Sequence, residues 1–144
     1  MDVLSMKLYE YNMERNSNCS SYVAWWNTWD HEHLYYVHGQ FRNSKILSES
    51  NESVVILTQY QLPFIKIKIK GFHCMFNISN SHCRVIDYLP FGLEVITDIL
   101  FHEVSKENCI IKNRYRIYGC FLFFLPIKLF MKYFIDQWNE TNWQ

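Results

Sequence analysis

The sequence lacks a hydrophobic run long enough to cross a membrane. Its longest uncharged apolar piece runs from Gly119 to Ile127, and Pro126 and Lys128 interrupt the surrounding segment. A membrane-spanning helix needs about 20 consecutive apolar residues. We therefore expect no transmembrane segment, although the stretch 120–134 leaves open a helix that lies on a membrane surface.

Several features that mark common functional classes are also missing. There is no Gly-rich phosphate loop, no G-x-S-x-G nucleophile elbow and no Cys-x-x-Cys pair. Charge of one sign is not in excess either, because 14 Lys and Arg balance 14 Asp and Glu. Nucleic-acid binders carry a basic surface, so the sequence argues against a nucleic-acid partner.

Cysteines are few and scattered. The five cysteines are odd in number, and Met1-Asp2 opens an ordinary polar segment with no sign of a secretory signal. We expect free thiols in a reducing cytoplasm. The length of 144 residues, with 49% hydrophobic and 19% charged residues, predicts one globular domain over 1–144.

Aromatic residues, in contrast, are abundant. Eleven Phe, ten Tyr and five Trp make up 18% of the chain. This is more than a small core needs, and it indicates an interior lined by aromatic side chains, as either core or ligand cavity.

The first part of the chain predicts a strand and two short helices. Residues 7–13 alternate like a strand. Ser20 or Ser21 can cap a helix over 22–29. Residues 30–38 then read as a second helix, which Asp30 begins and Gly39 ends.

From residue 53 onward the apolar pattern has a period of two, which is typical of strands. In "FIKIKIK" the isoleucines face one way, and Lys66, Lys68 and Lys70 face the other. We expect this lysine row to be a solvated outer face. The expected strands are 53–60, 64–70, 72–78, 82–88, 93–104 and 109–119, with Asn and Ser residues forming a hairpin turn between the third and the fourth.

The C-terminal end predicts one long helix. Pro126 suits its first turn, and an apolar stripe follows at helical spacing, made of Ile127, Phe130, Met131, Phe134 and Trp138. An antiparallel sheet with one apolar helix to cover it must curve round that helix. We therefore predict an α+β fold with a cavity between the curved sheet and the C-terminal helix.

This element order, together with "W-x-x-W-D-H-E-H-L-x-x-V-H" at 26–38, resembles the helix-grip (SRPBCC) superfamily. That superfamily includes START lipid-transfer domains, Bet v 1-like proteins, polyketide cyclases and the catalytic domain of Rieske-type oxygenases. The resemblance implies a hydrophobic or aromatic ligand, lipid or polyketide-like, in the cavity. It implies ligand contacts from Trp26, His33, Tyr36, Val37, His38, Phe101, Tyr115, Phe130 and Phe134.

A distant similarity to the oxygenase domain suggests a possible binding site for ferrous iron. In that domain a His-x4-His pair and a distant carboxylate bind ferrous iron, and the matching residues here are His33, His38 and Asp136. Five residues on a helix separate the two histidines by roughly 140° in projection, and Asp136 lies about 180° from the apolar stripe. We therefore expect no cofactor, with Fe(II) as the alternative.

Two further sets of residues suggest chemistry. Asp30, His33 and His38 are candidates for acid/base catalysis, as in a cyclase or hydratase, although Asp30 also suits a helix cap. The "HC" pairs at 73–74 and 82–83 could supply four zinc ligands. Adjacent strand residues point to opposite faces, however, which argues against zinc.

Ligand binding is the leading function predicted from the sequence, with an enzyme or a ligand-free interaction domain as alternatives. The sequence leaves the oligomeric state open.

Overall fold

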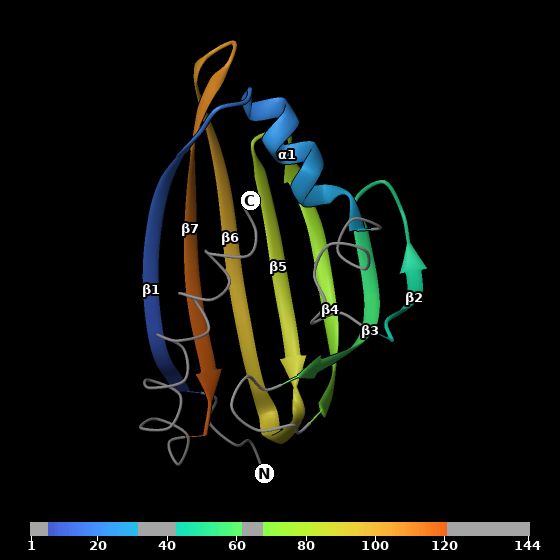
Figure 1. The fold of residues 1–144 in the computed structure, drawn as a ribbon. Coiled ribbons are helices and arrows are strands. Elements are labelled where there is room, and N and C mark those ends of the chain that lie inside the picture. The colour runs from blue at the N-terminus through green and yellow to red at the C-terminus, as the bar shows by residue number, and fades with distance from the viewer. Residues whose placement is uncertain (1–5, 32–42, 62–67, 121–144) are drawn as a thin grey trace.

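The computed structural model describes residues 6–31, 43–61 and 68–120. These residues form one antiparallel sheet of seven strands in the order β1-β7-β6-β5-β4-β3-β2, with the helix α1 packed against it (Figure 1). The elements are β1 (Met6–Ser17), α1 (Ser21–Trp29), β2 (Lys45–Glu49), β3 (Ser53–Gln61), β4 (Lys68–Ser79), β5 (His82–Leu89), β6 (Leu93–Ser105) and β7 (Asn108–Gly119).

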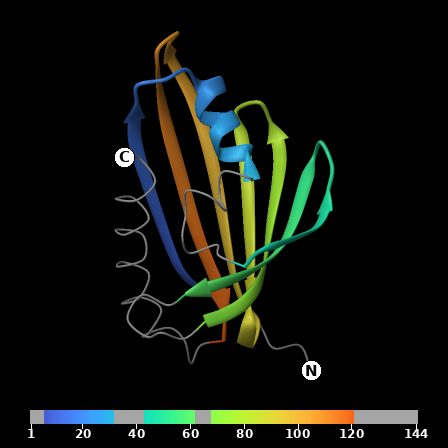
Figure 2. The same ribbon diagram turned by 45° about the vertical axis from the view of Figure 1, so that its right-hand side comes forward.

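The sheet is strongly curved, and α1 lies on its concave face near one end (Figures 1 and 2). The helix contacts β5, β6 and β7. Ala24 and Trp25 are its buried residues, and they join a cluster with Cys83, Phe101 and Ile111 from these strands. The rest of the concave face lies beyond the reach of α1.

The first helix begins and ends where local signals predict. The Ser20 hydroxyl accepts a hydrogen bond from the Val23 N–H at 3.3 Å, which satisfies one of the free amides of the first turn. The Asp30 N–H donates to the Trp26 carbonyl at 2.8 Å and closes the last turn. The helix predicted over 22–29 is therefore confirmed, with Ser20 as its cap.

Side chains alternate between the two faces of the sheet. On β7, Ile111, Tyr115 and Ile117 are buried and face the concave side. Lys112 and Arg114 are exposed on the convex side. The alternation that the sequence predicts for 109–119 is therefore confirmed.

The lysine row is confirmed where the structure describes it. Lys68 and Lys70 are exposed, and their strand register places them on the convex face. Lys66 lies outside the described residues. The predicted break between 64–70 and 72–78 is wrong, because β4 runs without interruption through Gly71.

The strand β2 was not predicted. It pairs with β3 at the sheet edge, and all five of its residues are exposed. A strand with no buried face has no apolar alternation, so periodicity cannot reveal it.

The predicted second helix, 30–38, and the predicted C-terminal helix, 126–138, fall almost wholly outside the described residues. Both remain predictions. Within the described ranges, no helix is long and apolar enough to cross a membrane.

Candidate functional site

Three polar side chains meet on the concave face of the sheet. Nδ1 of His73 on β4 lies 2.6 Å from Oδ1 of Asp87 on β5. The Tyr60 hydroxyl, from β3, donates a hydrogen bond to the same carboxylate oxygen. Asp87 therefore accepts from a phenol and an imidazole at once.

Strand register explains how the three residues meet. His73 pairs directly with Asp87 across β4 and β5, so their side chains share one face. Tyr60 is one strand farther away, and its ring reaches over Gly71 of β4. A Cβ at Gly71 would lie only 3.1 Å from Tyr60 Cε2 and 2.6 Å from the Tyr88 carbonyl oxygen. Glycine at this position therefore provides the room that Tyr60 needs to reach Asp87.

The site lies among apolar side chains. His73 is only 5% exposed. Its neighbours in register on the concave face include Ile56 and Met75, both almost fully buried. A polar network in such surroundings is costly unless its members are hydrogen-bonded to one another.

Burial determines the protonation of Tyr60. Desolvation, reinforced by the negative charge of Asp87, raises the pKa of the Tyr60 hydroxyl far above its usual value. Tyr60 therefore stays a neutral donor. With Asp87 ionised, the carboxylate only accepts hydrogen bonds, and Nδ1 of His73 is then the donor.

A second polar group lies on the same face at the β1–β7 edge. The Asn113 side-chain amide donates to the Tyr115 hydroxyl at 3.0 Å. Burial raises the pKa of Tyr115. Desolvation also lowers the pKa of Arg15, which pairs in register with Ile111, to about 10. Arg15 still carries its charge near neutral pH.

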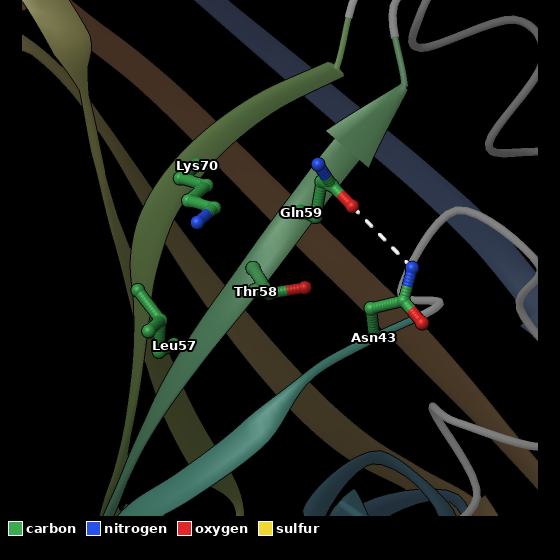
Figure 3. Close-up of a pocket in the computed structure, with 5 residues that line it drawn as sticks. All are labelled: Asn43, Leu57, Thr58, Gln59 and Lys70. Atoms are coloured by element: carbon green, nitrogen blue, oxygen red, sulfur yellow. Dashed lines mark hydrogen bonds between the residues drawn. The ribbon is translucent and has the colours of Figure 1, made fainter.

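A groove of about 340 Å³ opens at the other edge of the sheet, next to β3 (Figure 3). The described residues that line it are Asn43, Leu57, Thr58, Gln59 and Lys70. Asn43 donates to Gln59 at 3.4 Å, and Thr58 shares a 2.6 Å hydrogen bond with Ser44. Thr58 shares the concave phase of β3 with Tyr60, whereas Leu57, Gln59 and Lys70 belong to the convex phase, so the groove lies at the sheet edge and mainly on the convex side.

The convex face carries a different cluster, centred on Asp98. His82 Nε2 and Arg84 Nε lie 2.9 Å and 2.7 Å from Oδ1 of Asp98. Arg116 contacts the other carboxylate oxygen. Burial alone would raise the pKa of Asp98, but the hydrogen bonds and charges of these neighbours lower it below its usual value.

No family model matches the sequence, and no curated protein is significantly similar to it. Solved structures do match. Norcoclaurine synthase from Thalictrum flavum is 14% identical and superposes with a TM-score of 0.65, over 86% of this chain and 76% of its own. A protein of Thermus thermophilus is 11% identical with a TM-score of 0.70, over 92% and 90%. Zhui aromatase/cyclase from Streptomyces sp. R1128 is 9% identical with a TM-score of 0.56, over 76% and 68%.

The described residues form the curved antiparallel sheet of the helix-grip fold, with one helix packed on it. The predicted curved antiparallel sheet is confirmed, and so is the resemblance in fold to Bet v 1-like proteins and polyketide cyclases. The distant similarity to Rieske oxygenases remains a prediction.

Three residues of the predicted ligand-contact set lie within the described part of the chain. Phe101 is buried beneath α1, and Tyr115 is buried near Leu8 and Ile117. Trp26 is 52% exposed, whereas its neighbour Trp25 is 7% exposed and packs on the sheet. The remaining contacts lie outside the described residues: His33, Tyr36, Val37, His38, Phe130 and Phe134.

The predicted catalytic and iron residues are placed only in part. Asp30 follows α1 and closes its last turn through its backbone. His33, His38 and Asp136 lie outside the described residues, so the acid/base and iron hypotheses that involve them remain predictions.

The four residues of the "HC" pairs do not converge. His73 and Cys83 face the concave side, while Cys74 and His82 face the convex side. Among the described residues, no group of three or more His, Cys, Asp or Glu side chains is arranged to hold a metal ion. All five cysteines are free thiols, as predicted.

Tyr60 and Asp87 are not among the site residues predicted from sequence, and His73 is predicted only as a possible zinc ligand. One signal was available. His73 lies on the same face of β4 as the buried Met75. A polar residue thus occupies a position at which the period-two pattern predicts an apolar residue. A buried polar residue of this kind needs a partner, but only the register shows that the partner is Asp87.

Proposed function

We propose that this helix-grip protein binds a hydrophobic or aromatic small molecule on the concave face of its sheet. The observation that carries the proposal is the hydrogen-bonded network of Tyr60, His73 and Asp87 within an apolar lining. Small-molecule sites typically combine an apolar wall with a few polar groups that orient the ligand.

The known ligands and activities of the similar solved structures support this proposal. A structure of norcoclaurine synthase contains dopamine and hydroxybenzaldehyde, and another match is an aromatase/cyclase. Both point to flat aromatic compounds more than to long lipid chains. The predicted contacts Trp26, Tyr36 and Phe130 would add aromatic surface for such a ligand.

Fluorescence titration with N-phenyl-1-naphthylamine, a neutral aromatic probe, tests the binding. We expect saturable binding, with displacement by 2-naphthol at lower concentration than by decanoate. The reverse order would indicate a lipid ligand. No saturable binding by the folded protein would contradict the proposal.

Two variants locate the binding on the concave face. His73→Gln and Tyr60→Phe should each weaken binding of 2-naphthol, which can hydrogen-bond, by about fivefold, since one hydrogen bond contributes about 1 kcal/mol. The matched control is His82→Gln, on the convex face of the same hairpin. Equal losses in His82→Gln and His73→Gln would place the binding elsewhere.

A further inference from the structure

We propose that Cys19 and Cys109 form a redox-active pair, which a small dissolved disulfide converts reversibly from two thiols to one disulfide bond. The bond would join the segment that leads into α1 to the start of β7. This inference is independent of the proposed function, because it requires no ligand on the concave face.

The pairing of β1 with β7 brings these two cysteines together from distant parts of the chain. Ser17, the last residue of β1, pairs in register with Cys109 near the start of β7. The chain then bends, and Ser20 caps α1 (Figure 1). Cys19 lies in this bend, and its side chain packs against the buried cluster that contains Cys109.

The two thiols also interact with each other. Burial is the main reason why the pKa of Cys109 is raised, and the charge and hydrogen bond of the neighbouring Cys19 thiol raise it further. Sγ of Cys19 lies 3.2 Å from Oγ of Ser17 as well. Both cysteines are free thiols in this structure. Two reduced sulfur atoms are thus held side by side at one corner of the sheet.

The exposure of the two cysteines gives them different roles. Cys19 is partly exposed, whereas Cys109 is only 1% exposed. A dissolved disulfide can therefore reach Cys19 first, and Cys109 is placed to react with the product. An accessible thiol beside a resolving thiol is the usual arrangement of redox-sensitive cysteines. The Ser17 hydroxyl and the positive charge of Arg15 oppose the rise in the pKa of Cys109, which favours its thiolate.

The proposed step is a thiol–disulfide exchange in two parts. The Cys19 thiolate attacks one sulfur of the small disulfide, whose S–S bond breaks, and a small thiolate leaves with the electron pair. The Cys109 thiolate then attacks the Cys19 sulfur and displaces the second small thiolate. The two protein sulfurs are oxidised, the small disulfide is reduced to two thiols, and the protons of the two cysteines pass to these thiolates.

The positions of the other three cysteines set them apart from this pair. Cys83 belongs to the same buried cluster as Cys109, but it lies on β5, and β6 separates β5 from β7. Strands two places apart are separated by about 10 Å, whereas the Cα atoms of a disulfide lie within about 7 Å. Cys74 faces the convex side, and Cys120 follows the opposite end of β7. Among the described cysteines, Cys19 is therefore the partner within reach of Cys109.

The disulfide would fasten α1 to the sheet. Cys19 directly precedes Ser20, the residue that caps the helix. A bond from Cys19 to β7 would restrict the opening of α1 away from the concave face. It would also restrict the unfolded chain, which stabilises the folded state.

The test exposes the full-length protein to mixtures of oxidised and reduced glutathione, followed by iodoacetamide labelling under denaturing conditions and mass spectrometry. The reduced wild type should take up five labels, one for each cysteine. Under oxidising mixtures it should take up two fewer, with a single peptide link between Cys19 and Cys109. Reduced glutathione in excess should restore all the labels.

Three variants test the assignment and the order of attack. Cys109→Ala should stop at a mixed disulfide of Cys19 with glutathione, because the resolving thiol is missing. Cys19→Ser should form no internal disulfide and should leave Cys109 reduced. Cys120→Ser, at another partly exposed cysteine, is the matched control and should still lose two labels on oxidation.

Several results would overturn the proposal. These are a wild type that keeps every label in excess oxidised glutathione, a mixed disulfide at Cys19 that the wild type never resolves, and an internal disulfide in Cys19→Ser. If Cys109→Ala does not fold, Cys19→Ser decides the matter, because its side chain is partly exposed. Oxidation should raise the Tm of the wild type by about 5 °C or more and leave the Tm of Cys19→Ser unchanged. An unchanged Tm in the oxidised wild type would overturn the fastening of α1.

Discussion

His73 and His82 lie on the two paired strands of one hairpin and face opposite sides of the sheet. Each is held by an aspartate on a neighbouring strand, His73 by Asp87 and His82 by Asp98. The sheet thus carries two histidine–aspartate pairs that can be changed independently. One belongs to the concave interior, and the other to the ionic cluster of the convex face.

Asp98→Asn should destabilise the protein near neutral pH by about 1–3 kcal/mol, because it removes the acceptor charge that Arg84 and Arg116 share. The folded-state pKa of Asp98 is lowered. Its contribution is therefore fully present above the unfolded value of about 3.9 and is lost as the pH falls through the folded value. Urea unfolding at pH 7 and at pH 3 should show the difference between wild type and variant shrinking at the lower pH. Glu10→Gln, on a carboxylate that is only partly buried, should show a smaller difference at pH 7. A difference between wild type and variant that stays the same at pH 3 would contradict the prediction.

Gly71→Ala should destabilise the fold by about 1–3 kcal/mol, because the new methyl group would overlap the Tyr88 carbonyl oxygen and crowd the Tyr60 ring. It should also weaken binding of 2-naphthol by displacing Tyr60. Gly119→Ala is the matched control, since there the nearest atom, 2.7 Å away, is the end of the flexible Leu93 side chain. Thermal unfolding of both variants gives the comparison, and equal stability of Gly71→Ala and wild type would show that Tyr60 does not depend on this glycine.

Trp25→Ala and Trp26→Ala should behave differently although the residues are adjacent. Trp25 is 7% exposed and anchors α1 on the sheet, so its removal should cost about 3–5 kcal/mol. Trp26 is 52% exposed, and its removal should cost less than about 1 kcal/mol. If Trp26 contacts the ligand, as predicted, its replacement should instead weaken binding of N-phenyl-1-naphthylamine. Urea unfolding and probe titration of both variants check these outcomes, and a large stability loss in Trp26→Ala would mean that the residue supports the fold.

We expect the purified protein to take up no Fe(II) under anaerobic conditions, as measured by elemental analysis after desalting. The alternative of an iron site makes a definite counter-prediction. If about one equivalent binds, His33→Ala and Asp136→Ala should each abolish uptake, because two imidazoles need a carboxylate to complete the ligand set. That result would show the expectation of no cofactor to be wrong.

The features that could be predicted from the sequence are those that depend on interactions between residues close together in the chain. Ser20 was predictable as a cap, because its hydroxyl bonds an amide only three residues away. The phase of β7 was predictable because alternation is a local consequence of strand geometry. The split of β4 at Gly71 was a wrong inference from a local rule, since the glycine accommodates a tyrosine from the neighbouring strand and does not end its own.

The strand-rich class, the alternation of faces, the start of α1 and the resemblance to the helix-grip superfamily all follow from the order of the amino acids. So does the conclusion that adjacent His and Cys residues could not converge on one metal ion. The meeting of Tyr60, His73 and Asp87, in contrast, depends on tertiary packing. Their contact requires the register of three strands and the space above Gly71, and both arise between segments far apart in the chain. Local sequence preferences do not indicate such pairings. The residues of the candidate site can therefore be identified only from the assembled sheet.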